Sequence, residues 1–375
     1  MKTARLFVTI LILAAGMAAQ ESPRQYVYRP LSVSFVPGVA TNSEPWNVSS
    51  DYSFNIIGGQ LGRLQGIELG GVYNYEEDDV LGYQAAGVFN RVGRDFTGLQ
   101  QAGVVNIVGR EFGGVQTAGA VNVLGGCFGG LQMAGAANIV GGCFTGLQMA
   151  GAANIVDSSV YGAQMAGSVN VTGGHLWGAQ LSGAVNIAEE FTGAQIGLVN
   201  ICGTGRGLQF GLVNIAEEVD VPIGLVSIVE NGQFHVNAWA SEYSLLNLGI
   251  KTGSRSIYNI FMVGCRPDGD LTRLIAGMGI GGHIPLQEFF VDIDALGGSV
   301  YGGPDWFREG QIALLSSLRM TGGWQLSDKL ALTAGPSVNV RVSEFADEQD
   351  GTLLDMHEDW DVRVWPGFTI GFQLL

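Results

Sequence analysis

The stretch Gly-Leu-Gln-Met-Ala-Gly-Ala-Ala-Asn-Ile-Val occupies residues 130–140 and recurs without change at residues 146–156. It is the clearest copy of a phrase, G-x-Q-x-x-G-x-x-N, that recurs every 16 residues from Gly82 onward and shortens to about 14 in the last two copies. A unit this short cannot bury its own apolar face, so consecutive units must stack on one another. The repeated amides are Gln84, Gln100, Gln116, Gln132, Gln148, Gln164, Gln180, Gln195 and Gln209, with Asn90, Asn106, Asn122, Asn138, Asn154, Asn170, Asn186, Asn200 and Asn214.

Other residue types also occupy fixed slots of the repeat. A glycine stands two positions before every repeated glutamine, from Gly82 to Gly207, and this suits a corner that needs a positive φ or a close backbone approach. Charged residues collect in one segment between phrases, such as Arg94 and Asp95. We therefore expect that segment to be the exposed corner. A large apolar residue, usually Phe, stands four positions before most of the glutamines: Phe96, Phe112, Phe128, Phe144, Val160, Leu176 and Phe191.

Two folds use such a unit. In a parallel β-solenoid each unit is one turn with two short strands, and in a β-barrel each unit is a hairpin. A hairpin of 16 residues leaves about six or seven residues per strand, fewer than the roughly 9–11 that cross a membrane. The solenoid also places equivalent side chains of successive turns on top of one another, so that Asn and Gln can form amide ladders. We expect a glycine-rich parallel β-solenoid of about ten turns, with barrel hairpins as the alternative.

From about Gln233 the pattern changes to longer strands of alternating polarity. In the last of them apolar residues such as Phe368 and Phe372 alternate with Arg363, Thr369 and Gln373. Apolar residues on one face and polar residues on the other are typical of an outer-membrane barrel, although a soluble β-sandwich gives a similar alternation. We predict an all-β chain whose solenoid is joined to an antiparallel β-barrel of about 8–10 strands. Eight candidate strands lie near 234–240, 243–251, 256–264, 272–284, 289–295, 310–321, 330–341 and 362–374.

The predicted domains follow from these patterns. Residues 1–20 combine a basic start, an uncharged apolar stretch and a small-residue exit, which is typical of a secretory signal peptide. Residues 21–59 contain two alternating segments that we expect to pair with the barrel, because a closed barrel removes edge strands. Residues 60–232 form the solenoid, and residues 233–375 form the barrel.

The charge of the chain excludes one class of partner. The formal net charge of −16 argues against nucleic acid as a partner, since phosphate binding needs a basic face.

Cys127 and Cys143 fill the same slot of consecutive repeats, so they should be neighbours. Four cysteines in a chain of 375 residues do not form a disulfide scaffold, and we expect these two to be unpaired small apolar residues rather than a disulfide.

The phrase at 207–214, Gly-Leu-Gln-Phe-Gly-Leu-Val-Asn, resembles the GLQ-x-GL-x-N repeats of a bacterial surface-repeat family, as do the earlier copies. The segment 366–372 resembles the closing strand of Gram-negative outer-membrane barrels, which often ends in Phe where this chain has Leu375. The resemblance covers most of residues 50–230 and implies an outer-membrane or cell-surface location. The family has no established activity, so no site residues are carried over.

Nothing in the chain predicts catalysis, a cofactor or a metal. The histidines, His175, His235, His283 and His357, are scattered, and we expect His175 to be solvated in a corner. The G-x-G-x-x-G match at 277–282 lacks a following helix, so it is interpreted as a glycine-rich barrel strand. The acidic segments 76–79 and 344–361 are interpreted as solvated loops, with calcium binding by 344–361 as the weaker alternative because no EF-hand spacing is present.

The sequence therefore predicts a non-enzymatic protein of the outer membrane or cell surface, with a structural or adhesive role. Its partners would be outer-membrane lipid and an extracellular ligand or surface partner. A small-solute channel or transport protein is the alternative, although eight to ten strands leave a nearly filled interior. An enzyme embedded in the barrel, using His235 or His283, ranks third.

Overall fold

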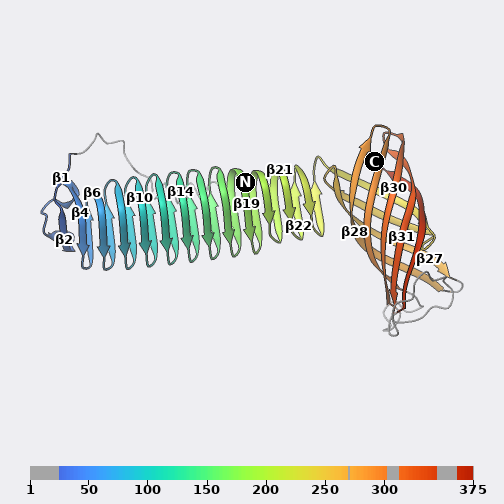
Figure 1. The fold of residues 1–375 in the computed structure, drawn as a ribbon, viewed down its shortest axis with the longest axis horizontal. Coiled ribbons are helices and arrows are strands. Elements are labelled where there is room, and N and C mark those ends of the chain that lie inside the picture. The colour runs from blue at the N-terminus through green and yellow to red at the C-terminus, as the bar shows by residue number, and fades with distance from the viewer. Residues whose placement is uncertain (1–24, 269–270, 302–311, 344–360, 375) are drawn as a thin grey trace. The chain divides into compact units, whose positions relative to one another are not determined.

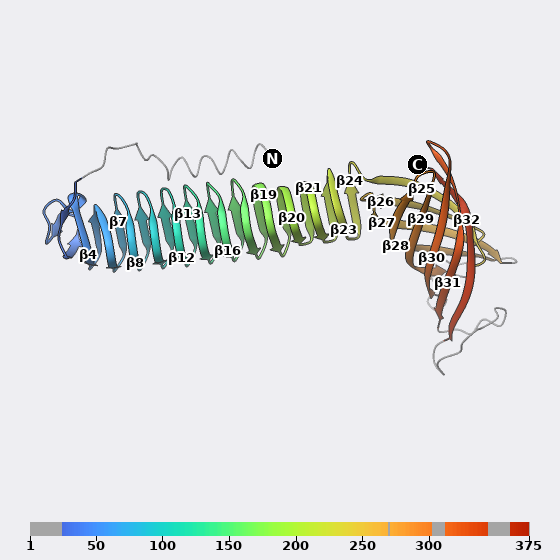
Figure 2. The ribbon, with the colours of Figure 1, turned by 45° about the horizontal axis from the view of Figure 1, so that its top comes forward.

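A computed structural model of the chain describes residues 25–268, 271–301, 312–343 and 361–374, and it confirms a parallel β-solenoid joined to a closed, eight-stranded antiparallel barrel (Figures 1 and 2). The chain divides into two compact units, Met1–Gly207 and Leu208–Leu375, so the last solenoid turns belong to the unit of the barrel. The predicted signal peptide and the acidic segment 344–360 lie outside the described residues. Within the described ranges, no helix has the length and apolar character needed to cross a membrane.

The solenoid has about 11 turns. Its one helical element is a short 3-10 turn, η1 (Pro45–Asn47). Its strands are β1 (Val27–Tyr28), β2 (Leu31–Val36), β3 (Val39–Ala40), β4 (Val48–Asn55), β5 (Gly58–Leu61), β6 (Arg63–Gly70), β7 (Tyr73–Glu76), β8 (Val80–Ala86), β9 (Phe89–Val92), β10 (Phe96–Ala102), β11 (Val105–Val108), β12 (Phe112–Ala118), β13 (Val121–Leu124), β14 (Phe128–Ala134), β15 (Ala137–Val140), β16 (Phe144–Ala150), β17 (Ala153–Val156), β18 (Val160–Ala166), β19 (Val169–Ser182), β20 (Val185–Ile196), β21 (Val199–Phe210), β22 (Val213–Ala216), β23 (Glu218–Ile223) and β24 (Val226–Val229).

From β8 to β18 each strand pairs in parallel with the equivalent strand of the next turn, in a register that places equivalent repeat positions side by side. Phe96 pairs with Phe112 and Gln100 with Gln116. The rings at the phenylalanine slot consequently stack, with centroids 4.8 Å apart for Phe96 and Phe112. Parallel pairing at a spacing of about 4.8 Å is therefore what converts a 16-residue period into a continuous core.

Two amide ladders run through the interior, as the sequence predicts. The Nδ2 of Asn106 donates to the Oδ1 of Asn122 at 2.9 Å, so each asparagine donates to the following turn. The Nε2 of Gln116 donates to the Oε1 of Gln100 at 2.8 Å, so each glutamine donates to the preceding turn. The two ladders thus have opposite polarity, and these fully buried amides are satisfied without solvent.

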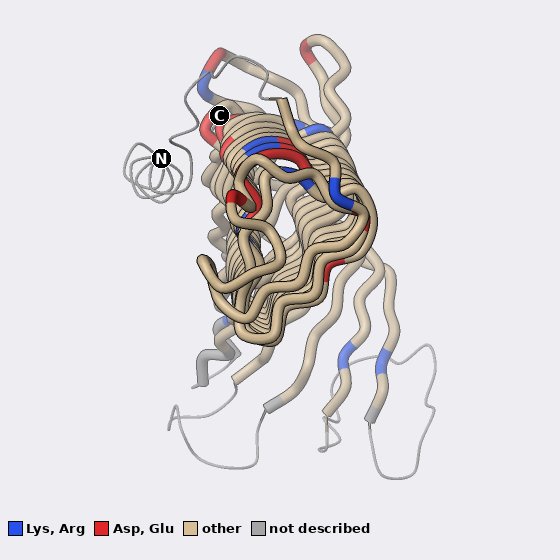
Figure 3. The backbone as a smooth tube through the Cα atoms, turned by 90° about the vertical axis from the view of Figure 1, so that its left-hand side faces the viewer, with Lys and Arg blue, Asp and Glu red and all other residues tan. Residues whose placement is uncertain are grey.

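The corner becomes extended chain in β19, and the repeat shortens from the following turn on. β19, β20 and β21 run through the corner as single long strands. The register between β19 and β20 shifts between Thr172 and His175, which absorbs the missing residue. Figure 3 shows that most residues of the solenoid are uncharged and that the charged residues gather mainly at one corner.

The prediction that residues 21–59 pair with the barrel is wrong. β2 pairs in parallel with β4, and β4 pairs in parallel with β6, so these strands are the first solenoid turns. Asn55 at the end of β4 donates to Asn74 at 2.9 Å and so begins the asparagine ladder. The barrel closes without them, because β25 (Gln233–Ser241) pairs with β32 (Asp361–Leu374).

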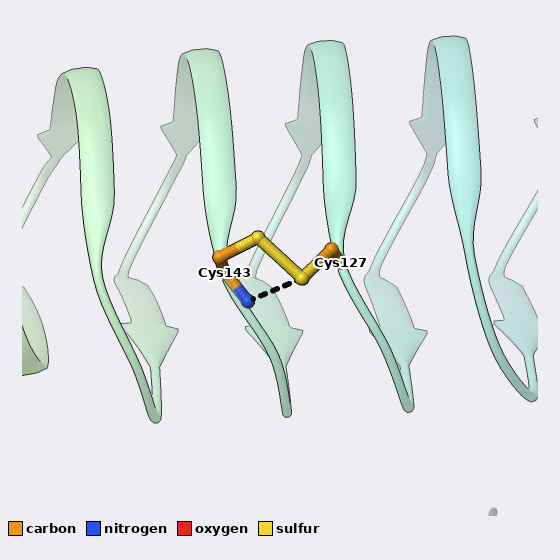
Figure 4. Close-up of a disulfide and its surroundings, with 2 residues drawn as sticks. All are labelled: Cys127 and Cys143. Carbon is orange, nitrogen blue, oxygen red and sulfur yellow. Dashed lines mark hydrogen bonds between the residues drawn. A yellow bond between two sulfur atoms is a disulfide. The ribbon is translucent and has the colours of Figure 1, made fainter.

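The expectation that Cys127 and Cys143 are unpaired is also wrong. The two residues form a disulfide between consecutive turns, with their Cα atoms 4.5 Å apart (Figure 4). This Cα separation lies within the range for disulfides because it is the spacing of adjacent parallel strands. The bond therefore ties one turn to the next at a corner.

Replacing both cysteines, Cys127→Ser with Cys143→Ser, should destabilise these two turns by about 3 kcal/mol, the loop-closure contribution of a loop of this length. Hydrogen exchange of peptides covering 118–150 in the full chain would measure the loss. Dithiothreitol should produce the same change in the unaltered protein and none in the double variant. Equal exchange with and without reduction would show that the disulfide contributes nothing.

The barrel is built of eight strands, as counted from the sequence. The glycine-rich match at 277–282 lies inside β28, which confirms that it is a barrel strand. The strands are β25, β26 (Leu246–Gly253), β27 (Ile257–Asp268), β28 (Leu271–Leu286), β29 (Phe289–Tyr301), β30 (Ile312–Ser327), β31 (Leu330–Ser343) and β32.

Candidate functional site

The barrel interior is the first candidate site, because alternation along the strands directs charged side chains inward. Lys251, Asp292 and Asp294 are at most 1% exposed, and Arg319 is 4% exposed. Residues two apart on a strand share a face, so Asp292 and Asp294 of β29 both point into the barrel. A buried charge requires a partner of opposite charge, and the interior supplies one.

Lys251 on β26 is at the centre of one polar network. Its Nζ donates to the Oδ2 of Asp292 at 2.5 Å and to the Oε1 of Gln373 at 3.3 Å. The other carboxylate oxygen of Asp292 lies 2.7 Å from the Nδ1 of His283, and Gln373 contacts the Nδ1 of His235 at 3.0 Å. Histidines that looked scattered in the sequence are therefore linked through one chain of contacts.

A second network lies beside the first. The Nε of Arg319 donates to the Oδ2 of Asp294 at 2.7 Å, and the hydroxyl of Tyr258 donates to the Oδ1 of the same carboxylate. The guanidinium of Arg319 also lies 4.4 Å from the centre of the Trp239 ring. The inward parity of positions 251, 292, 294 and 319 was the signal in the sequence that could have placed these side chains in the barrel interior.

The barrel interior also holds an apolar cluster, small cavities and further buried polar side chains such as Asn339 and Arg341. A buried cluster includes Trp239, Ile260, Met262 and Leu296. Two interior cavities have volumes of about 30 Å³ and about 10 Å³. Spaces of that size hold one or two water molecules, so they offer no path for a larger solute.

The outer surface of the barrel is apolar. Leu318 and Phe368 are each 57% exposed, and Val263 is 58% exposed. Three aromatic residues follow one another around the barrel at the level where β32 ends: Phe289 pairs with Trp324, and Trp324 and Phe372 pair with opposite sides of Leu332. An apolar band edged by aromatic residues is the surface that a barrel presents to lipid.

The solenoid carries a shallow apolar groove of about 740 Å³ along one side. Met133, Met149 and Met165 form one wall, and alanines at the following position of each turn form the floor. The methionines are 37–39% exposed. Methionine is flexible and polarisable, so the groove is a surface that can adapt to an apolar partner.

His175 lies in a surface cluster at a corner of the solenoid, where the sequence places it, and its ring is partly covered by its neighbours. Its ring stacks on Trp177 with centroids 3.7 Å apart, and Trp177 stacks in turn on Tyr161. The Nδ1 of His175 lies 3.1 Å from a carboxylate oxygen of Glu190, and its Nε2 lies 3.0 Å from the hydroxyl of Thr192. Its side chain is 22% exposed, because Trp177, Glu190 and Thr192 contact it.

The first turns of the solenoid hold two buried carboxyl groups, one in a repeat amide slot and one, Glu76, in the apolar slot that Val92 fills in the next turn. Glu68 occupies the glutamine slot, and Gln84 donates to it at 3.0 Å and also to Glu76. Burial, together with the charge of Glu68, raises the pKa of Glu76 well above its usual value. The segment interpreted as the solvated loop 76–79 therefore begins with a fully buried carboxyl group.

The raised pKa of Glu76 makes the stability of the first solenoid turns depend on pH. Because the folded state keeps the proton that the unfolded chain releases above about pH 4.5, this group's contribution to stability is complete below that pH and is lost as the pH rises through the folded pKa. Glu76→Gln should therefore stabilise the first turns at pH 7 and reduce the change in their stability with pH. Hydrogen exchange of peptides covering 63–92 between pH 5 and 8 would test this, with the exposed Glu111→Gln as control. Equal pH profiles for Glu76→Gln and the unaltered protein would contradict it.

Among the described residues, no group of three or more His, Cys, Asp or Glu side chains is placed to hold a metal ion. His235 and His283 contact only amide and carboxylate partners in the interactions above, and neither lies beside a hydroxyl nucleophile there. The site is therefore best described as a barrel with an apolar outer surface and an ion-paired interior. The chain matches no protein-family model, and comparisons with curated proteins and with solved structures find no match either.

Proposed function

We propose that this chain is a non-enzymatic outer-membrane protein in which the barrel is the membrane anchor and the solenoid is the structural or adhesive part. The observation that carries the proposal is the inverted polarity of the barrel. Its buried strand residues include Lys251, Asp292 and Arg319, while its exposed strand residues include Leu314, Leu318 and Phe368. A water-soluble barrel would need the opposite arrangement, because exposed apolar patches of this extent favour association.

The filled interior favours an anchor over a small-solute channel. Conduction requires a continuous polar path, whereas the two cavities found among the described interior residues measure about 30 Å³ and about 10 Å³, and Lys251 and Arg319 are each paired with an aspartate. Eight-stranded barrels have an interior just wide enough for side chains to fill. We therefore expect no ionic conductance above the bilayer background.

The test is fractionation of Gram-negative cells that express the full chain, followed by electrophoresis of the outer-membrane fraction with and without boiling. Recovery in that fraction, with faster migration before boiling, would support the anchor. Recovery as a soluble protein with no migration shift would overturn it. Step-like conductance of the purified protein in planar bilayers would favour the channel.

A further inference from the structure

The connections of the barrel fall into two sets, one at each end. Because the barrel has eight strands, β25 begins and β32 ends at the same end, where Val236 and Leu330 both pair with Leu374. The connections 254–256, 287–288 and 328–329 also lie at this end. The connections 242–245, 269–270, 302–311 and 344–360 lie at the opposite end.

The two ends differ in the length of their connections. Each connection at the end shared by the strand termini has two or three residues, whereas the two longest connections, 302–311 and 344–360, are both at the other end. In outer-membrane barrels the short turns face the periplasm and the long loops face the outside. The end at which β25 begins therefore has the character of a periplasmic end.

The solenoid reaches the barrel at this same end. β24 ends at Val229 and β25 begins at Gln233. The last solenoid turn is also bonded to the short-turn end, since Ser254 Oγ donates to the carbonyl of Asp220 at 2.9 Å and Asn259 Nδ2 donates to the carbonyl of Gly224. These bonds hold the last turn of the solenoid against the proposed periplasmic end.

We propose that the solenoid lies in the periplasm and not on the cell surface, an inference that rests on the proposed outer-membrane function. A solenoid outside the cell would have to cross the membrane, yet the lumen is occupied, among the described residues, by paired charges and apolar side chains. Nor can its polar backbone pass through lipid. The disulfide between Cys127 and Cys143 suits this compartment, because the bacterial periplasm is oxidising.

A periplasmic solenoid would bind periplasmic rather than extracellular partners. The apolar groove walled by Met133, Met149 and Met165 and the cluster around Trp177 would face molecules that reside in or pass through the periplasm. An extracellular ligand or a surface of another cell would meet only the connections at the opposite end of the barrel. The solenoid is thus an inward-facing extension of an outer-membrane anchor.

Single-cysteine reporters in the full chain would test the compartment. In a background with Cys202→Ala and Cys265→Ala, the reporters are Ser158→Cys in an exposed solenoid corner, Lys329→Cys in a short turn, and Gln349→Cys in the connection 344–360. A membrane-impermeant maleimide should label Gln349→Cys on intact cells. It should label Ser158→Cys and Lys329→Cys at least tenfold more after the outer membrane is permeabilised.

Labelling of Ser158→Cys on intact cells to the level seen after permeabilisation would overturn the periplasmic placement. If the same variant were still recovered as a heat-modifiable protein in the outer-membrane fraction, the anchor would stand and only the placement would fail. Absence of all three variants from that fraction would overturn the anchor and, with it, the placement. The two failures are therefore distinguished on the same cells.

Discussion

Gly114→Ala should open the solenoid locally at a cost of about 4 kcal/mol, combining strain at a backbone conformation that only glycine adopts with overpacking of the core. Gly114 has a φ of +128°, and a Cβ atom there would lie 2.0 Å from the carbonyl oxygen of Gly98 in the preceding turn. Neither turn can move away, because each is bonded to its neighbours on both sides. The substitution should therefore break the register of consecutive turns.

The neighbouring Gly113 provides a matched control. A Cβ atom there would meet no atom within 4 Å, so Gly113→Ala should leave stability nearly unchanged. Hydrogen exchange of peptides covering 96–130 in the full chain should quicken about a thousandfold for Gly114→Ala, since each 1.4 kcal/mol is a factor of ten. Similar exchange in the two variants would refute the steric role of the repeated glycine.

The solenoid interior was predictable because, in a parallel stack, the repeat length determines which residues are neighbours. When turns of equal length pair in parallel, residues 16 apart become neighbours, so the asparagine and glutamine ladders follow from the spacing alone. The placement of β2 and β4 did not follow in this way. Their residues alternate with a period of two, as do those of any half-buried strand, and alternation does not identify the strand's partner.

The pairing of side chains was harder to predict from the sequence than the position of the backbone. The repeat placed Cys127 and Cys143 side by side, but a bond between them depends on the direction of each Cβ, which a spacing does not specify. In the barrel, the alternation along β26 and β29 is enough to place Lys251 and Asp292 on the inward face. Their contact depends on strand tilt and stagger, which only the closed barrel determines.

Asp292→Ala should destabilise the barrel by about 3–5 kcal/mol, the usual cost of removing one partner from a buried ion pair. The substitution leaves the Lys251 ammonium, which is 1% exposed, without its carboxylate. His283 loses the same partner. The fraction of heat-modifiable barrel remaining after incubation in increasing urea would measure the loss, with the exposed turn variant Asp328→Ala as the control.

The pair can also be removed together, and this separates charge from packing. Lys251→Met combined with Asp292→Leu leaves no unpaired charge and nearly preserves volume, so it should recover most of the stability lost in Asp292→Ala. If the double variant were as unstable as the single one, the loss would come from packing around β29 and not from a stranded ammonium. If Asp292→Ala itself stayed within about 0.5 kcal/mol of the unaltered protein, the range of ordinary surface substitutions, water would be reaching Lys251 and the lumen would be open. The same measurement therefore tests whether the interior is closed, on which the distinction between anchor and channel depends.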